Sequence, residues 1–285
     1  MRRRPRRSWL FVPGADPAAH EAAARSGADV LIQELEDFTP PELRPRARAL
    51  AAALYDRWRK AGKIAAVRVN PLEICGREDL AAVLKGRPDI VLMSKVVSPE
   101  QVQALASLTS TEELVPNIET AAGLLNAFHI GRASKRVTAM LVASEDMVAD
   151  LGAERSRGAQ ELAYVRQRFL VECRAAGVEA IDCPYTFSDR KGAVAEAKHA
   201  KKLGYRMKSV VAPEHAAAIN SVFTPSAIEI GNAKRLIAAF EKSRKEGKER
   251  AKVDGRLVEV PVYSAARRLL LSAAHTPPPP RKKAR

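Results

Sequence analysis

The amino-acid sequence predicts an α/β fold, a TIM (β/α)8 barrel with a C-terminal helical extension. Eight short apolar runs are each followed by a stretch that is typical of a helix. The runs are rich in Val, Ile and Leu and do not alternate with polar residues, which is typical of strands buried on both faces. Parallel strands joined by helices close most simply into a barrel, and 285 residues are enough for a barrel of about 250 residues plus an extension.

The predicted strands leave room for one helix between each pair. In order they are Ser8–Val12, Val30–Leu35, Ile64–Val69, Ile90–Met93, Leu114–Ile118, Val137–Ala143, Val178–Ile181 and Met207–Val211. Helices are expected at about 17–26, 41–60, 78–85, 99–108, 120–130, 159–176, 188–203, 213–220 and 226–245. Asp16 before Pro17 is a typical helix start, and Gly27, Gly62 and Gly204 are typical helix ends.

One barrel domain with short appendages is expected. Residues 1–7 are predicted to be a basic N-terminal tail, 8–245 the catalytic barrel, 246–275 a C-terminal arm and 276–285 a disordered basic tail. Glu246–Gly255 is charged and contains glycine, so we expect a mobile link there. Val258–Leu271 is apolar and needs a surface that buries it. Packing on a neighbouring subunit and an intramolecular helix both fit that composition.

Most of the positive charge of the sequence lies near its two ends. The formal net charge is +15, and residues 1–7 with 276–285 carry nine of these positive charges. Solvated tails are the plainer interpretation of these charges, and nucleic-acid binding through the two ends is the alternative.

No apolar run approaches the length of a membrane span or of a secretory signal. Cys75, Cys173 and Cys183 form no metal-ligand spacing and no even set, which indicates a reducing cytoplasm.

In a TIM barrel the chemistry takes place at the carboxyl ends of the strands. The charged residues that the sequence predicts there are Glu36, Asp37, Arg68, Lys95, Glu119, Asp146, Asp182 and Lys208. None of the five histidines ends a predicted strand, so we expect none of them in the site.

Glu119 and Asp146 are the candidate metal ligands. They end the fifth and sixth predicted strands, which are neighbours in a barrel. Two converging carboxylates without histidine or cysteine form a hard oxygen site, which suits Mg²⁺. The alternative is that both are acids at helix N-termini, stabilised by the helix dipole.

Arg68, at the end of the third predicted strand, is the candidate for binding a substrate carboxylate, because a guanidinium can form a bidentate pair. An ion pair with Glu36 or Asp37 is the alternative, and the two roles do not exclude each other. Lys95 and Lys208 are expected to be ion-pair partners of acids at the rim, with a Schiff-base role as the alternative.

Short motifs in a fixed order cover roughly residues 6–272. They are Arg7–Gly14, Leu35–Asp37, Val67–Pro71, Ile118–Gly123, Ser144–Asp146 with Ala149–Gly152, Phe223–Ser226 with Glu229-Ile230, and Asp254–Arg256 with Pro261. Together they resemble the citrate lyase beta-subunit-like enzymes of the HpcH/HpaI aldolase superfamily, of the malyl-CoA and citramalyl-CoA lyase type.

The resemblance implies a Mg²⁺-dependent carbon–carbon lyase that cleaves a 3-hydroxyacyl-CoA into acetyl-CoA and a 2-oxo acid. It implies Glu119 and Asp146 as metal ligands, and Arg68 with Glu119 as substrate-binding residues. In this family an acid on the C-terminal arm of a neighbouring subunit completes the site, and the matching residue here is Glu259. Glu259 is therefore a catalytic candidate. Asp37 and Glu36, in the motif Leu35–Asp37, are the other two. The implied assembly is a homo-oligomer, trimer or hexamer, with arm exchange.

The sequence departs from the family pattern at five places. Glu259 stands where aspartate is usual, Val211–Pro213 replaces Ile-His-Pro, Met207 and Ala143 replace glycines, and Gln33-Glu34 stands where aspartate is usual. Thioester hydrolysis and aldol cleavage of a free 2-oxo-3-deoxy acid on the same site are therefore alternatives. A further alternative is a non-catalytic barrel that binds a partner or nucleic acid through its basic tails.

Overall fold

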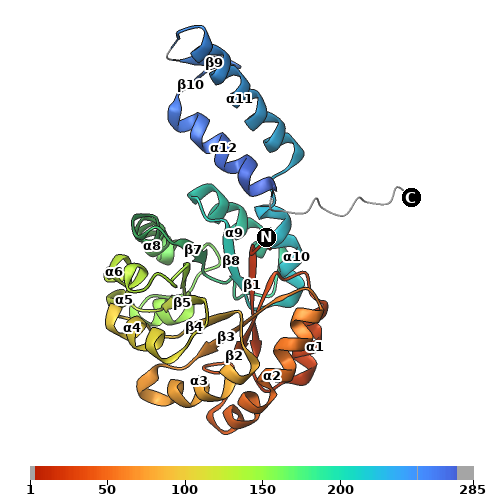
Figure 1. The fold of residues 1–285 in the computed structure, drawn as a ribbon, viewed down its shortest axis with the longest axis vertical. Coiled ribbons are helices and arrows are strands. Elements are labelled where there is room, and N and C mark those ends of the chain that lie inside the picture. Colours follow the sequence, from red (N-terminus) through yellow and green to blue (C-terminus); the bar gives the residue numbers. More distant parts are fainter. Residues whose placement is uncertain (1–3, 249, 275–285) are drawn as a thin grey trace, which may run out of the picture. The chain divides into compact units, whose positions relative to one another are not determined.

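A closed barrel of eight parallel strands forms the body of the protein, as predicted (Figure 1). The computed structural model describes residues 4–248 and 250–274. The strands are β1 Ser8–Pro13, β2 Val30–Glu34, β3 Ile64–Val69, β4 Ile90–Met93, β5 Glu113–Ile118, β6 Ala139–Val142, β7 Glu179–Asp182 and β8 Met207–Val210. Each begins and ends within two residues of its predicted bounds.

Side chains of the strands pack in two concentric layers. Along β2, Val30 and Ile32 belong to the apolar cluster inside the barrel, whereas Leu31 belongs to the cluster between the strands and the helices. Both faces of each strand are therefore buried, which explains why the apolar runs do not alternate.

Ten helices accompany the strands in this part of the chain. They are α1 Pro17–Arg25, α2 Arg44–Lys60, α3 Arg77–Val83, α4 Pro99–Leu108, α5 Ala121–Leu125, α6 Ala127–Arg132, α7 Glu145–Asp150, α8 Ala163–Ala176, α9 Arg190–Leu203 and α10 Pro213–Phe223. The Asp16 side chain accepts the backbone N–H groups of Ala18 and Ala19 at 2.9 and 3.2 Å, which confirms the predicted start of α1. The predicted helix at 120–130 is divided at Asn126, and α7 was not predicted.

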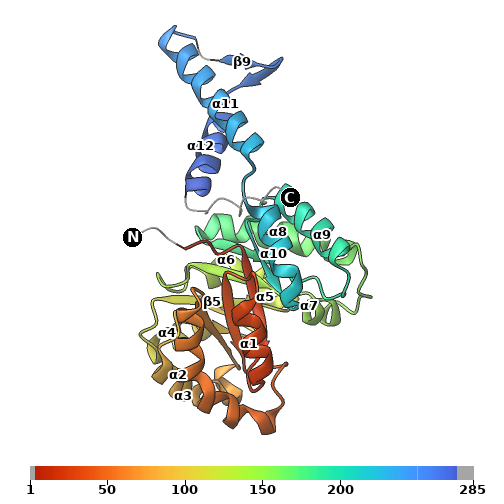
Figure 2. The same cartoon turned by 90° about the vertical axis from the view of Figure 1, so that its right-hand side faces the viewer.

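The compact unit that contains the barrel is Arg6–Phe223, and Thr224 onward belongs to a second unit. The second unit contains α11 Ala227–Lys245, the strands β9 Ala251–Val253 and β10 Arg256–Val258, and α12 Val260–Ala274. Within it α11 packs along α12 (Figure 2). The ring of Phe240 stacks on that of Tyr263, with centroids 4.7 Å apart. The predicted boundary after residue 245 falls inside this unit, and packing on a neighbouring subunit stays a prediction.

The prediction of a mobile link at Glu246–Gly255 is wrong for residues 251–255, which belong to a β-hairpin. β9 and β10 pair antiparallel, with Val253 opposite Arg256. Asp254 and Gly255, which join them, have φ angles of +48° and +79°. Two consecutive positive φ angles at Asp-Gly are typical of the tight turn that matches strand twist, and Asp-Gly is a hairpin signal in sequence.

The start of the N-terminal tail is anchored to the barrel. Arg7 Nε lies 2.9 Å from Asp29 Oδ2, and Arg6 pairs with Glu113. Arg6 and Arg7 therefore do not belong to a solvated tail, because each has a buried or half-buried carboxylate partner. Residues 1–3 and 275–285 of the predicted tails lie outside the described residues. Within the described ranges, no helix combines the length and the apolar character needed to cross a membrane.

Candidate active site

Arg68 lies at the carboxyl end of β3 among carboxylates from β2 and β5. Its Nε is 2.9 Å from Glu34 Oε1, its Nη2 is 3.0 Å from Glu36 Oε2, and its Nη1 is 3.4 Å from Glu119 Oε1. The ring centroid of Phe11 is 4.8 Å from the guanidinium carbon. Burial lowers the pKa of the guanidinium, but the three acids together raise it above its usual value. The predicted ion pair with Glu36 is confirmed, and Arg68 stays charged.

Glu34 is a member of this cluster that sequence reasoning missed. It is fully buried, and besides Arg68 it accepts the backbone N–H of Glu36 at 2.6 Å and that of Phe38 at 2.5 Å. These bonds shape the turn after β2 that carries Glu36 and Asp37 toward Arg68. A charged residue inside the apolar run 30–35 was the available signal.

Lys95, just after β4, approaches the same acids. Its Nζ lies 2.5 Å from Glu36 Oε1 and 3.7 Å from Asp37 Oδ1, which confirms the predicted ion-pair role. The hydrogen bond to Glu36 raises the pKa of Lys95. Its backbone has a φ of +53°, a left-handed conformation that costs free energy in a non-glycine residue and is often found at functional sites.

Glu119 follows the last residue of β5 and is fully buried. Its Oε2 has no hydrogen-bond partner among the described residues. Burial raises the pKa of Glu119 to about 8, against the opposing effect of Arg68, and Glu36 and Asp146 raise it further. Asp146 therefore lies near enough to act on Glu119. It lies in the first turn of α7 rather than at the end of β6, and it is partly exposed.

Acids outnumber bases at this mouth of the barrel. The carboxyl groups are those of Glu34, Glu36, Asp37, Glu119 and Asp146, and the cations are Arg68 and Lys95. Burial of the surplus acids is costly unless they are protonated or bind a cation. The raised pKa of Glu119 and its unpaired oxygen are what this surplus predicts for the protein without a ligand.

Asp182 ends β7 as predicted, but neither its side chain nor that of Lys208 joins this cluster, so the expectation that both line the mouth of the barrel is wrong. Ile181 and Met207 face the inside of the barrel, and side chains alternate along a strand. Asp182 and Lys208 therefore face the helices. Lys208 Nζ is 2.6 Å from Asp182 Oδ2, and Arg166 of α8 pairs with Asp182 at 2.8 Å.

Glu259 belongs to the second unit, between β10 and α12. Its Oε1 lies 3.1 Å from Arg250 Nε, and about half of its side chain is exposed, with a relative accessibility of 49%. Its catalytic role stays a prediction.

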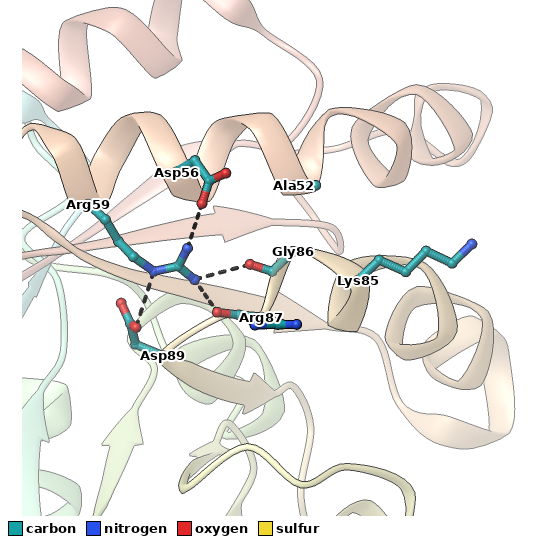
Figure 3. Close-up of a pocket in the computed structure, with 7 residues that line it drawn as sticks. All are labelled: Ala52, Asp56, Arg59, Lys85, Gly86, Arg87 and Asp89. Atoms are coloured by element: carbon teal, nitrogen blue, oxygen red, sulfur yellow. Dashed lines mark hydrogen bonds and ion pairs between the residues drawn. The ribbon is translucent and has the colours of Figure 1, made fainter.

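A separate cavity of about 550 Å³ lies at the opposite end of the barrel, before β4 begins (Figure 3). Arg59 spans it, at 3.0 Å from Asp56 and 3.3 Å from Asp89, and it donates to the carbonyl of Gly86 at 3.1 Å. The guanidinium ties α2 to the segment before β4.

Comparison with known proteins places these observations in a family. The HpcH/HpaI aldolase/citrate lyase family profile matches residues 7–213. A (3S)-malyl-CoA thioesterase of Cereibacter sphaeroides is 35% identical over 257 residues, covering 90% of each chain. Citrate lyase subunit beta of Leuconostoc mesenteroides is 31% identical and covers 92% of this chain and 91% of its own. Among solved structures, CitE from Mycobacterium tuberculosis in complex with magnesium, acetoacetate and coenzyme A has a TM-score of 0.80 at 26% identity, covering 96% of this chain and 100% of its own.

Proposed function

This chain belongs to the HpcH/HpaI aldolase/citrate lyase family, and we propose that it is a Mg²⁺-dependent lyase of 3-hydroxyacyl-CoA thioesters such as malyl-CoA or citramalyl-CoA. The products would be acetyl-CoA and a 2-oxo acid. The observation that carries the proposal is the surplus of buried acid around Arg68, with one oxygen of Glu119 unpaired. The CitE complex with magnesium and coenzyme A supports the same ligands here.

The donor set at the mouth fits a magnesium ion. Glu119 and Asp146 would hold it, because Mg²⁺ binds one or two protein carboxylates and completes its coordination with substrate oxygens and water. The unpaired Oε2 of Glu119 and its pKa of about 8 indicate a carboxyl that Arg68, which it shares with Glu34 and Glu36, neutralises only in part. When bound, the ion supplies Lewis-acid polarisation of the substrate's oxygen atoms.

Arg68 would bind and orient the carboxylate of the 2-oxo acid portion. The contacts to Glu34, Glu36 and Glu119 leave part of its N–H donors unused, since a guanidinium has more donors than these three acids engage. Glu34 and Glu36 hold the guanidinium in one orientation, so little side-chain entropy is lost when the substrate binds.

Two proton transfers accompany the cleavage. The hydroxyl proton of the substrate must leave while the carbon–carbon bond breaks, and the electron pair of that bond passes to the carbon next to the thioester carbonyl. Burial raises the pKa of Glu36, which makes its carboxylate a stronger proton acceptor, and Asp37 lies beside it. Glu259, brought by the arm of a neighbouring subunit, would return a proton to the new acetyl carbon.

Thioester hydrolysis at the same site is the second candidate function. The observation that favours it is the 35% identity to a malyl-CoA thioesterase along 90% of both chains. Aldol cleavage of a free 2-oxo-3-deoxy acid has less support, because the arm with Glu259 has no evident task on a substrate that lacks a thioester.

The products distinguish these functions. The full-length protein with Mg²⁺ is incubated with malyl-CoA, and thioesters and acids are separated by chromatography. Acetyl-CoA with glyoxylate identifies the lyase, whereas malate with free coenzyme A identifies the thioesterase. Removal of Mg²⁺ with EDTA should stop either reaction. The corresponding products of citramalyl-CoA are acetyl-CoA with pyruvate, or citramalate with free coenzyme A. Absence of both pairs of products with both substrates would contradict the proposal.

Mixing two inactive variants tests the predicted homo-oligomer with arm exchange. Glu259→Gln lacks the arm acid and Arg68→Ala lacks the carboxylate site, so neither variant alone should turn over. If the arm crosses between subunits, mixed oligomers contain some sites with both groups intact, and part of the activity returns. No recovery in verified mixed oligomers would indicate an arm that acts within its own subunit.

We also propose a cytoplasmic protein without a nucleic-acid partner. The three cysteines, Cys75, Cys173 and Cys183, are all free, which is typical of a reducing compartment. Binding of nucleic acid through the N-terminal tail has less support, because Arg6 and Arg7 are paired with acids of the barrel.

A further inference from the structure

Asn117 is a polar residue in the interior of the barrel, just below the proposed metal ligand. Val115, two residues earlier on β5, belongs to the inner apolar cluster, and residues two apart on a strand face the same side. Asn117 therefore points inward, and Glu119 follows two residues later. Asn117 is completely buried.

The side-chain amide of Asn117 has no hydrogen bond of good geometry. Its Nδ2 and Oδ1 both lack such a partner among the described residues, although the amide lies near enough to Glu119 to lower the pKa of that carboxyl. Glu119 Oε2 and Ser144 Oγ, at the end of the neighbouring strand, also lack a hydrogen-bond partner among these residues. Asn117 is in register with Leu141 of β6, three residues before Ser144, so these unpaired groups gather at the ends of two adjacent strands.

Unpaired buried polar groups are rare, because each has lost its bonds to water without a replacement. A leucine has nearly the same shape as asparagine and would pack against the inner cluster at no such cost. Keeping an amide here therefore lowers stability. A group that is costly in the free protein and aimed into the site indicates a ligand that completes it.

We propose that Asn117 is a substrate-binding residue that donates a hydrogen bond from Nδ2 to the carboxylate of the 2-oxo acid, with Ser144 Oγ as a second neutral donor. Neutral donors suit this place, since the guanidinium of Arg68 already faces Glu34, Glu36 and Glu119. This inference rests on the proposed function. It assigns to Asn117 the binding of the 2-oxo acid rather than of the thioester.

Substitution by an isosteric apolar residue separates this role from a structural one. Asn117→Leu is compared with the wild-type protein, and Val115→Ala is the control for general loss of packing in the barrel. Three quantities are measured on the full chain: the urea midpoint of unfolding, the Kd of Mg²⁺ alone, and the Kd of pyruvate and of glyoxylate with Mg²⁺ saturating, the Kd values by calorimetry.

Asn117→Leu should raise the Kd of pyruvate and glyoxylate about tenfold or more, because a hydrogen bond to a charged group is lost. Its urea midpoint should equal or exceed that of the wild type, and its Kd for Mg²⁺ should stay within about twofold. Val115→Ala should lower the urea midpoint and leave the Kd of the 2-oxo acids unchanged, since it removes apolar contacts only.

An unchanged Kd for both 2-oxo acids in folded Asn117→Leu would overturn the proposal. So would a Kd for Mg²⁺ that rises in step, because Asn117 would then act on Glu119 rather than on the substrate. If Asn117→Leu does not fold, Asn117→Ala, which removes the amide, takes its place. The same rise in the Kd of the 2-oxo acids is expected, with a lower urea midpoint because the smaller side chain leaves a cavity. Failure of the wild-type protein to bind either acid with Mg²⁺ would count against the proposed function itself, before any variant is made.

Discussion

Two clusters in this barrel combine acidic with basic side chains, and they differ in the balance between negative and positive charges. Between the strands and the outer helices, Arg166 and Lys208 face Asp182 and Glu196, with Arg166 and Lys208 at 2.8 and 2.6 Å from Asp182. Two cations meet two carboxylates there. At the mouth, acids outnumber cations and Glu119 keeps an unpaired oxygen.

The outer cluster shows that ligand-type residues at short distances do not make a metal site. Ligand atoms of Asp182, Cys183 and Glu196 lie within 4.8 Å of one another. Burial and the charge of Asp182 raise the pKa of Cys183 to about 12, so no thiolate is available, and Lys208 and Arg166 occupy the positions that a cation would take. Glu196 Oε2 in the outer cluster also lacks a hydrogen-bond partner among the described residues, so the balance of charge, rather than residue types or unpaired atoms, distinguishes the two clusters.

The largest effect is expected from Glu119→Gln, at the mouth of the barrel. Turnover should fall about a thousandfold or more, because the amide cannot replace the carboxylate toward Mg²⁺. The urea midpoint at pH 7 should not fall, since glutamine resembles the protonated form that burial favours. Turnover is measured with the substrate that the product assay identifies, and Asp146→Asn serves as the parallel variant. Full activity in either variant would contradict the metal assignment.

Lys208→Met should lower the stability and leave Mg²⁺ binding intact, the opposite of what is expected for Glu119→Gln. It leaves carboxylates of the outer cluster without one of their two cations, and breaking a buried pair typically costs about 3 kcal/mol or more of unfolding free energy. The Kd of Mg²⁺ should stay unchanged in the fraction that folds. A loss of Mg²⁺ binding at full stability would show that the two clusters are not separate in function.

Arg68→Lys should have a smaller effect that is confined to the substrate. Lysine keeps the charge but loses the planar set of donors, so the KM of the 2-oxo acid in the condensation direction should rise about tenfold. The KM of the thioester should change little, which makes it the internal control. Equal KM values for the 2-oxo acid in variant and wild type would argue against a direct contact with Arg68.

The pH dependence of Mg²⁺ binding should be the smallest effect in the neutral range. Without metal, Glu119 has a pKa of about 8, so below that pH a proton competes with Mg²⁺. The Kd of Mg²⁺ should fall as pH rises and level off above about 8. The pKa is raised above its ordinary value of 4.5, so the metal-free protein should lose stability as pH rises through about 8. A Kd that does not vary between pH 6 and 9, in calorimetry with the Glu119→Gln variant as control, would refute the competition.

Much of the architecture follows from local patterns in the chain. Each of the eight strands was placed by a short apolar run, and α4 has the bounds predicted for it. The errors are also local: the helix at 120–130 is divided at Asn126, and the turn Asp254-Gly255 makes a hairpin of a stretch that composition alone suggested to be a link. Asp-Gly is a known hairpin signal, but the charged composition of the surrounding residues led to the prediction of a link instead.

The site was predicted less completely, because its members come from different strands. Arg68, Glu36 and Glu119 were found as charged residues at strand ends, and their contacts confirm that these three meet. Asp182 was misplaced, since the direction of a side chain depends on the register of the whole strand.

Periodicity along the chain is a short-range property, and it was enough to predict strands, helices and their closure into a barrel. Which side chains face the axis, and which of them find a partner there, depends on residues far apart in the chain that meet only when the barrel closes. The contact of Glu34 with Arg68, and the position of Asn117 beside Glu119 without a hydrogen bond of good geometry, are consequences of that closure. Their contacts are between strands, so no pattern within one strand could have shown them.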